Sequence, residues 1–207
     1  MNVNKLFKSK TQMIIYIILS IIILGLFVYI GTYDFNKKVD TEAKQINQIL
    51  TMVPKKNIYK FTNSSEVNNL INSTTSSGIV LFGFKTNCWT NYFAKYVNEV
   101  AIENGIKEIG YYDFESDRKE KNGTYETIVN NLSIYLKYTD YNTADILAPA
   151  LLVIKNGNVL GYIDDTSFRT GDITPDIYWN DYNVMTFKDK LNGIFSDYVK
   201  EKNEKQK

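Results

Sequence analysis

The 207-residue chain is predicted to form a mixed α/β domain, with helices on both faces of one sheet, preceded by a single transmembrane helix. Three observations predict this fold class. An uncharged apolar run occupies residues 13–30, strand-like and helix-like segments alternate from residue 57 onward, and an Asn-Gly pair separates the last two strand-like segments. Alternating strands and helices favour a layered α/β sheet, and Asn-Gly supplies the positive φ angles of a tight hairpin.

The first two segments are an N-terminal tail, residues 1–12, and a predicted membrane-spanning helix, residues 13–31. A run of about 18 residues without a charge approaches the length that crosses a bilayer as a helix. Three lysines precede the run and two follow it, so the positive-inside rule places the N-terminus in the cytoplasm and the domain outside the cell membrane. A cleaved signal peptide is the alternative, although the run is long for one and no small-x-small site follows.

Residues 32–56 are predicted to form a juxtamembrane helix or stalk that ends at Pro54. Apolar residues recur there at helical spacing: Val39, Ala43, Ile46, Leu50 and Val53. This apolar face has two interpretations. It packs on the domain that follows, which we favour, or it forms a surface for a partner helix.

Five segments rich in β-branched and aromatic residues are the predicted strands, in chain order: residues 57–61, 79–84, 109–114, 148–154 and 159–163. The first alternates apolar and polar residues. The second is continuously apolar, which suits a central strand covered on both faces. The fourth is entered through a proline, Pro149, and Asn156-Gly157 connects it to the fifth as a hairpin.

Four segments with apolar residues at helical spacing are the predicted helices: residues 66–71, 89–103, 125–136 and 187–198. Ser64 or Ser65 is expected to cap the first, because a hydroxyl accepts the free N–H groups of a first turn. Asn104-Gly105 is expected to end the second through a left-handed residue. The polar stretch at residues 115–123 is expected to be a loop. The domain is thus predicted over residues 57–200, and residues 201–207 form a polar tail.

The composition excludes several classes of function. Lys and Arg together number 24 and Asp and Glu number 23, which gives a net charge of +1 and predicts no broad basic face for nucleic acid. Histidine is absent and Cys88 is the only cysteine. We therefore expect no metal site and no intramolecular disulfide, and no motif indicates a cofactor.

The order of elements is similar to that of the thioredoxin fold. Over residues 57–200 the chain resembles the Gram-positive thioredoxin-like proteins called bacteriocin transport accessory proteins. The features that carry the resemblance, in order, are the strand at residues 79–84, the turn containing Thr86, the helix through Glu103, the phrase at residues 103–109, the Ala148-Pro149 pair, the Asn156-Gly157 hairpin and the final helix. The resemblance implies a domain of the thioredoxin-like superfamily.

The turn after the second strand departs from the pattern of these relatives, which reads Gly-x-x-Thr-Cys-Pro-aromatic-Cys. Without a gap, Gly83 and Thr86 match, and the other four positions are occupied by Asn87, Cys88, Trp89 and Thr90. Asn87 and Thr90 then replace the two cysteines. A shift by one residue instead puts Cys88 and Asn91 at these positions. We prefer the ungapped placement because Thr86 and Trp89 both fit, and neither placement supplies two thiols.

The resemblance also assigns a role to Pro149, which corresponds to a proline that is cis in thioredoxin-like proteins. In those proteins it lies beside the turn and leaves a backbone edge free to pair with a bound peptide. The resemblance therefore implies that the binding residues are Thr86, Asn87, Cys88, Trp89, Thr90, Ala148 and Pro149.

Loss of the dithiol changes the function that we expect. Dithiol exchange needs a second thiolate to resolve the mixed disulfide, and this chain has none. We therefore predict an accessory or peptide- or protein-binding module of a secretion, bacteriocin or surface system. One alternative is a monothiol disulfide oxidoreductase with Cys88 as the catalytic thiol, since a thiol at a helix N-terminus is more acidic than a free one. Another is a structural subunit of a membrane complex, held by the anchor and the helix at residues 39–53.

A second cluster of aromatic residues, Tyr178, Trp179 and Tyr182, precedes the last helix. Aromatic side chains often anchor interfaces, which makes the cluster a candidate binding surface. The same residues are equally suited to seal the last helix onto the sheet. The sequence leaves both interpretations open.

Overall fold

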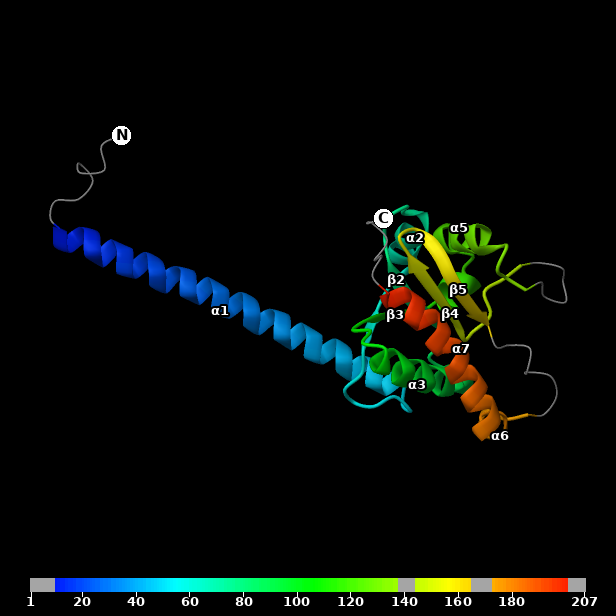
Figure 1. Ribbon diagram of the computed structural model, residues 1–207. Helices are drawn as coiled ribbons and strands as arrows, with labels where there is room; N and C mark the ends of the chain where they lie inside the picture. The colour runs from blue at the N-terminus through cyan, green and yellow to red at the C-terminus, as the bar shows by residue number, and fades with distance from the viewer. Residues whose placement is uncertain (1–9, 138–143, 165–172, 201–207) are drawn as a thin grey trace, which may run out of the picture. The chain divides into compact units, whose positions relative to one another are not determined.

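A computed structural model describes residues 10–137, 144–164 and 173–200 of the chain (Figure 1). Two compact units are present, Met1–Glu42 and Ala43–Lys207. The second unit contains the sheet and all of the helices after the first, and we refer to it as the domain.

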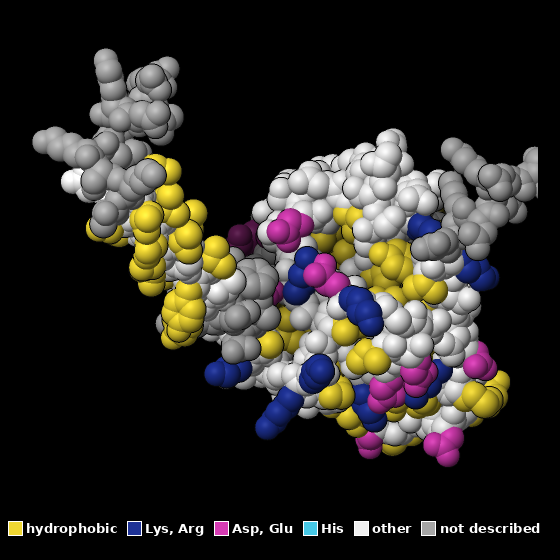
Figure 2. All heavy atoms as spheres, turned by 60° about the vertical axis from the view of Figure 1, so that its left-hand side comes forward, with side chains coloured by type: hydrophobic (Ala, Val, Ile, Leu, Met, Phe, Trp, Pro, Cys, Tyr) yellow, Lys and Arg dark blue, Asp and Glu magenta, His cyan; other side chains and the backbone are white. Residues whose placement is uncertain are grey.

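The first unit is formed by most of helix α1 (Lys10–Ile49). Within α1, the segment Gln12–Tyr33 has a mean hydropathy of 2.9 and is not buried. It is long and apolar enough to cross a membrane, and within residues 10–137, 144–164 and 173–200 it is the one segment of this kind. Its hydrophobic side chains are visible along the helix in Figure 2. The predicted span at residues 13–31 lies inside this segment, and the predicted stalk helix is a continuation of the same helix.

The sheet of the domain has five strands: β1 (Tyr59–Phe61), β2 (Gly78–Gly83), β3 (Ile109–Asp113), β4 (Ala150–Lys155) and β5 (Asn158–Asp164). Their order across the sheet is β1-β3-β2-β4-β5. The strands β1, β3 and β2 are parallel, whereas β4 is antiparallel to both β2 and β5. The mixed α/β class predicted from the sequence is therefore confirmed.

The domain's remaining helices are α2 (Ser64–Asn72), α3 (Cys88–Glu103), α4 (Glu115–Lys119), α5 (Gly123–Leu132), α6 (Pro175–Tyr178) and α7 (Asp181–Val199). Successive side chains of a strand point to opposite faces of a sheet, so the domain has two cores. One core combines residues of α3 and α7 with Leu81 and Leu151, and the other combines residues of α2 and α5 with Phe82 and Leu152. Helices thus cover both faces, as predicted.

The end of α1 contributes to the first of these cores. Ile46 and Leu50 are fully buried and Val53 is 7% exposed, all in one cluster with residues of α3. This is the packing interpretation favoured from the sequence. The compact domain therefore starts before residue 57, because the apolar positions between residues 43 and 53 belong to its core.

Two details of the local predictions are wrong. The cap of α2 is Asn63 and neither serine, because the Asn63 side chain accepts a hydrogen bond from the Glu66 N–H at 3.0 Å. The Glu66 carboxylate in turn accepts from the Asn63 N–H, which completes a capping box. The polar stretch at residues 115–123 is also more than a loop, since it contains the short helix α4.

The predicted turns agree with the backbone. Gly105 has a φ of 77° directly after α3, as a left-handed helix end requires. Asn156 and Gly157 have φ angles of 50° and 74° between β4 and β5, which is the hairpin geometry expected of Asn-Gly.

Candidate functional site

The candidate site begins at the turn between β2 and α3. Asn87 is the N-cap of α3, and its side-chain oxygen accepts a hydrogen bond from the Trp89 N–H at 2.8 Å. Asparagine is a favoured cap because its oxygen satisfies a backbone donor that has no partner inside the helix. Cys88 is thereby fixed as the first residue of α3, where its side chain is exposed.

The same asparagine joins the turn to the start of β4. Its Nδ2 atom donates to the carbonyl oxygen of Ala148 at 3.5 Å, and the Ala148–Pro149 peptide bond is cis. The antiparallel register of β2 and β4 explains the contact, because Phe82 lies opposite Ala150. The C-terminal end of β2 and the N-terminal end of β4 therefore lie side by side.

Thr90 has a different environment from its neighbours in the turn. Its side chain is fully buried, and its hydroxyl accepts a hydrogen bond from the Phe84 N–H at 3.4 Å. A Cβ atom on Gly83 would lie 2.5 Å from the Thr90 methyl carbon, so a side chain at residue 83 would force Thr90 to move. Thr90 and Ala148, which is 2% exposed, lie beneath the surface of the site, so their side chains are not available to a ligand.

Thr86 is exposed and contacts a residue that the sequence analysis did not single out. Its hydroxyl donates to a carboxylate oxygen of Glu115 at 3.4 Å, and Glu115 also accepts from Lys119 at 2.6 Å. The hydrogen bond from Lys119 lowers the pKa of Glu115, so the carboxylate stays ionised beside the turn. The i,i+4 spacing of Glu115 and Lys119 is the signal that could have predicted α4.

Trp89 connects the turn to the second aromatic cluster. It is partly buried, and its ring lies 5.7 Å from the ring of Tyr178 in α6. Trp179 is 6% exposed between Tyr96 at 5.1 Å and Phe187 at 5.0 Å. Trp179 therefore seals the start of α7 onto α3, whereas Tyr182 is 70% exposed. Trp179 thus has the sealing role considered from the sequence, whereas Tyr182 is the residue that is available as a binding surface.

Two hollows lie next to α4, and the smaller of them adjoins the turn through Phe84. A smaller one of about 290 Å³ is lined by Phe84, Glu115, Arg118 and Lys119. A larger one of about 610 Å³ extends from Arg118 past Tyr125 to Asp145. Arg118 pairs with Asp145 at 2.7 Å, and the Tyr125 hydroxyl donates to the same carboxylate at 2.6 Å. These contacts fix the chain shortly before Ala148 and hence one wall of the site.

The chemistry available at the turn is limited to one accessible thiol, hydrogen-bonding groups and aromatic surface. Cys88 has no second thiol in the chain to resolve a mixed disulfide. In the ranges 10–137, 144–164 and 173–200, no group of three or more Asp, Glu, His or Cys side chains could hold a metal ion. On the face in Figure 2, lysines and acidic residues of the domain are interspersed.

Comparison of the chain with protein-family models gives no match, and comparison with curated proteins gives none either.

Proposed function

We propose that the chain is a membrane-anchored, thioredoxin-like protein whose extracytoplasmic domain binds a peptide or protein partner without dithiol chemistry. The partner would belong to a secretion, bacteriocin or surface system for which this protein is an accessory. The observation that carries the proposal is the bond between Asn87 and Ala148. It joins the turn to the start of β4 at one surface. In the ungapped placement that we prefer, Asn87 and Thr90 stand where the thioredoxin-like proteins that this chain resembles have cysteine.

The anchoring part of the proposal rests on α1. Its segment Gln12–Tyr33 is apolar on all sides and unburied, which favours contact with lipid over contact with a soluble core. The lysines on either side of this segment in the sequence favour a cytoplasmic N-terminus.

The proposal is tested by placing a photo-cross-linking amino acid at Thr86 in the full chain, in its native membrane. Thr86 is exposed and directly precedes Asn87, so a partner bound at the turn lies within reach of the new side chain. A discrete cross-linked partner is expected, and it should persist when Cys88→Ser is added. Ile102, which is 48% exposed at the far end of α3, is the matched control position and should give no such product.

Two results would contradict the proposal. The first is the same cross-linked product from residues 86 and 102, which would show non-specific capture. The second is catalytic reduction of insulin disulfides in the presence of dithiothreitol, which would show that the turn carries redox turnover despite its single thiol.

A monothiol oxidoreductase is the second candidate, because Cys88 is exposed at the first residue of α3. It predicts that Cys88 in the folded chain is alkylated much faster than free cysteine near neutral pH. Alkylation at or below the rate of free cysteine would remove this candidate.

The structural-subunit alternative receives less support. It needs an apolar helix face at residues 39–53 that is free to bind a partner. Ile46, Leu50 and Val53 are instead buried in the chain's own core. From Ile46 to Val53 this face is therefore occupied by the domain itself.

A further inference from the structure

The corner where α6 meets α7 exposes apolar side chains that the proposed turn site does not use. Ile177 is 63% exposed, Tyr182 is 70% exposed and Met185 is 56% exposed. Tyr182 and Met185 are three residues apart in α7 and lie on one face of it. That face points away from the core, because Phe187 and Leu191 are buried on the opposite face.

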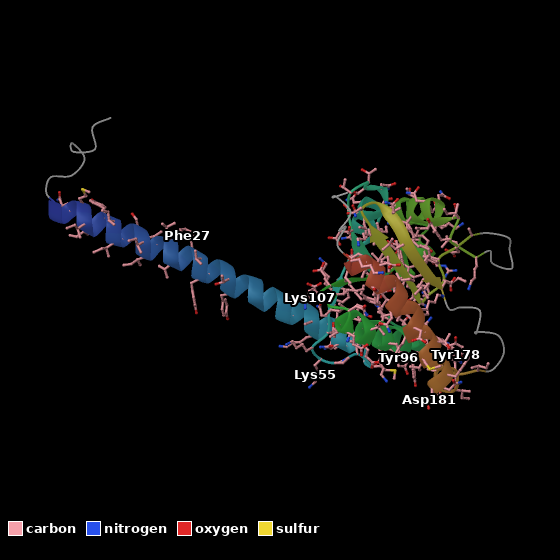
Figure 3. All side chains as sticks on the ribbon, viewed as in Figure 1. Phe27, Lys55, Tyr96, Lys107, Tyr178 and Asp181 are labelled. Carbon is pink, nitrogen blue, oxygen red and sulfur yellow. The ribbon has the colours of Figure 1, made fainter. Side chains whose placement is uncertain are left out.

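This corner is held firmly in place. Trp179 packs between Tyr96 and Phe187, and the side-chain amide of Asn183 donates to the Tyr178 carbonyl at 2.7 Å. Figure 3 shows Tyr178 and Tyr96 at this end of the domain. The backbone that presents these apolar side chains is already ordered, so binding costs it little conformational entropy.

The charges around these apolar residues are acidic. Asp176 and Asp181 are exposed in the first turns of α6 and α7, and Asp189 is exposed one turn beyond Met185 on the same face of α7. A hydrogen bond from Thr174 lowers the pKa of Asp176, which is therefore ionised at neutral pH. We define the α6–α7 surface as Asp176, Ile177, Asp181, Tyr182, Met185 and Asp189.

Two lysines of α7, Lys188 and Lys190, lie close to this surface in the sequence. Lys188 lies on the side of α7 that faces α3, where it pairs with Glu99 at 2.7 Å and lies over the Tyr96 ring. Lys190 follows Asp189 by one residue, so it projects about 100° around the helix from it.

We infer that the α6–α7 surface binds a basic peptide segment of a partner protein. Apolar side chains of the segment pack on Ile177, Tyr182 and Met185, and its lysines or arginines lie near the surrounding carboxylates. An anionic lipid surface carries the same sign of charge as these carboxylates and is repelled. A symmetric pair of copies would bring the same acidic patch against itself. Charge complementarity therefore selects a basic partner. This inference goes beyond the proposed turn site and does not depend on it.

The test uses the full chain in nanodiscs of zwitterionic phosphatidylcholine. The probe is a short labelled peptide with lysines and leucines in a glycine–serine background, and binding is followed by fluorescence anisotropy with empty nanodiscs subtracted. We expect saturable binding that Tyr182→Ser combined with Met185→Ser weakens about tenfold, since a few apolar anchors dominate such contacts. Asp181→Asn combined with Asp189→Asn should weaken it about threefold and reduce its dependence on salt.

Ile102→Ser is the matched control, because it removes an apolar side chain of similar exposure from α3 and should leave binding unchanged. The inference is overturned by absence of saturable binding, by equal binding of a peptide with glutamates in place of lysines, or by an Ile102→Ser effect as large as that of the surface variants. A dimer that is lost with Tyr182→Ser would identify a second copy as the occupant and would also overturn it.

Discussion

Asn87 shows how one side chain serves two parts of the candidate site. Its oxygen caps α3 through the Trp89 N–H, and its nitrogen reaches the Ala148 carbonyl at the start of β4. A cysteine at this position would accept the Trp89 N–H only weakly through its sulfur, and its S–H would be a weak donor to the Ala148 carbonyl. Asn87 therefore holds the turn between β2 and α3 against the start of β4.

The cap predicts different effects for two substitutions at this residue. Asn87→Ala should lower the free energy of unfolding by about 1 kcal/mol, because the Trp89 N–H loses its acceptor. Asn87→Asp should cost less, since a carboxylate keeps the acceptor and is favoured at a helix N-terminus. Urea denaturation of the full chain in detergent, followed by tryptophan fluorescence, measures both. Equal losses would show that the bond to Ala148 is the more important one.

The packing of Gly83 against Thr90 gives a second prediction at this scale. Gly83→Ala should destabilise the domain by about 1–3 kcal/mol, because the new methyl would overlap the Thr90 methyl carbon. Adding Thr90→Ser removes that carbon and keeps the hydroxyl that accepts from the Phe84 N–H, so it should restore part of the loss. Thermal unfolding of the single and double variants is the measurement. If Thr90→Ser fails to rescue Gly83→Ala, another neighbour, such as Tyr111, sets the limit at this position.

At the scale of secondary-structure elements, the end of α1 is the clearest departure from a simple anchor and stalk. Ile46 and Leu50 are fully buried in the core that also contains residues of α3. The hydroxyl of Thr51, just after α1, donates to the side chain of Asn91 in the first turn of α3 at 3.3 Å. The end of α1 and the residues after it thus pack against α3, the helix that begins at the candidate turn.

Truncating Ile46 should therefore affect the domain as a core substitution does. Ile46→Ala is expected to cost about 2–5 kcal/mol, because it removes buried methyl groups and leaves a cavity. Ile22→Ala is the matched control in the same helix, where the side chain is 55% exposed, and it should leave unfolding of the domain unchanged. Hydrogen exchange of β2 and β4 amides in both variants distinguishes the two outcomes. Equal protection in Ile46→Ala and the parent chain would contradict the core role of Ile46.

At the scale of the whole domain, buried tyrosines tie stability to alkaline pH. Burial raises the pKa of Tyr59, Tyr111, Tyr112 and Tyr125 above the ordinary value of 10.0. The hydrogen bonds of Tyr112 to Asp117 and of Tyr125 to Asp145 raise it further. Above pH 10 the unfolded chain loses these phenolic protons while the folded chain keeps them, so the folded state is fully stabilised below pH 10 and loses stability above it.

Each such tyrosine should remove about 1.4 kcal/mol of unfolding free energy per pH unit above 10. Absorbance at the tyrosinate band should show the buried tyrosines ionising only as circular dichroism reports unfolding. Tyr125→Phe should lower stability at neutral pH by about 1–2 kcal/mol, through loss of the bond to Asp145, and make the alkaline decline shallower. Tyr182→Phe, at a 70% exposed position, is the control and should change neither. Ionisation of these buried tyrosines near pH 10 without unfolding would refute this account.

The sequence by itself determined the order of the strands and of the longer helices α2, α3, α5 and α7, whereas the short helices α4 and α6 were not predicted. Helical and strand periodicities are local properties, so the apolar segment of α1, the run of β2 and the Asn156-Gly157 hairpin were all predictable. The chain has one cysteine, so a dithiol within the chain was excluded before any fold was considered.

Only the tertiary structure decided which residues of the candidate site are presented and which are buried. Asn87 and Ala148 are 61 positions apart, and no local pattern connects them. Thr90 is buried whereas Cys88 is exposed, and Trp179 is buried whereas Tyr182 is exposed, although the two residues of each pair are only two or three positions apart in the chain. The physical reason is the same in each case: burial depends on which elements pack together, and that packing joins segments distant in the chain.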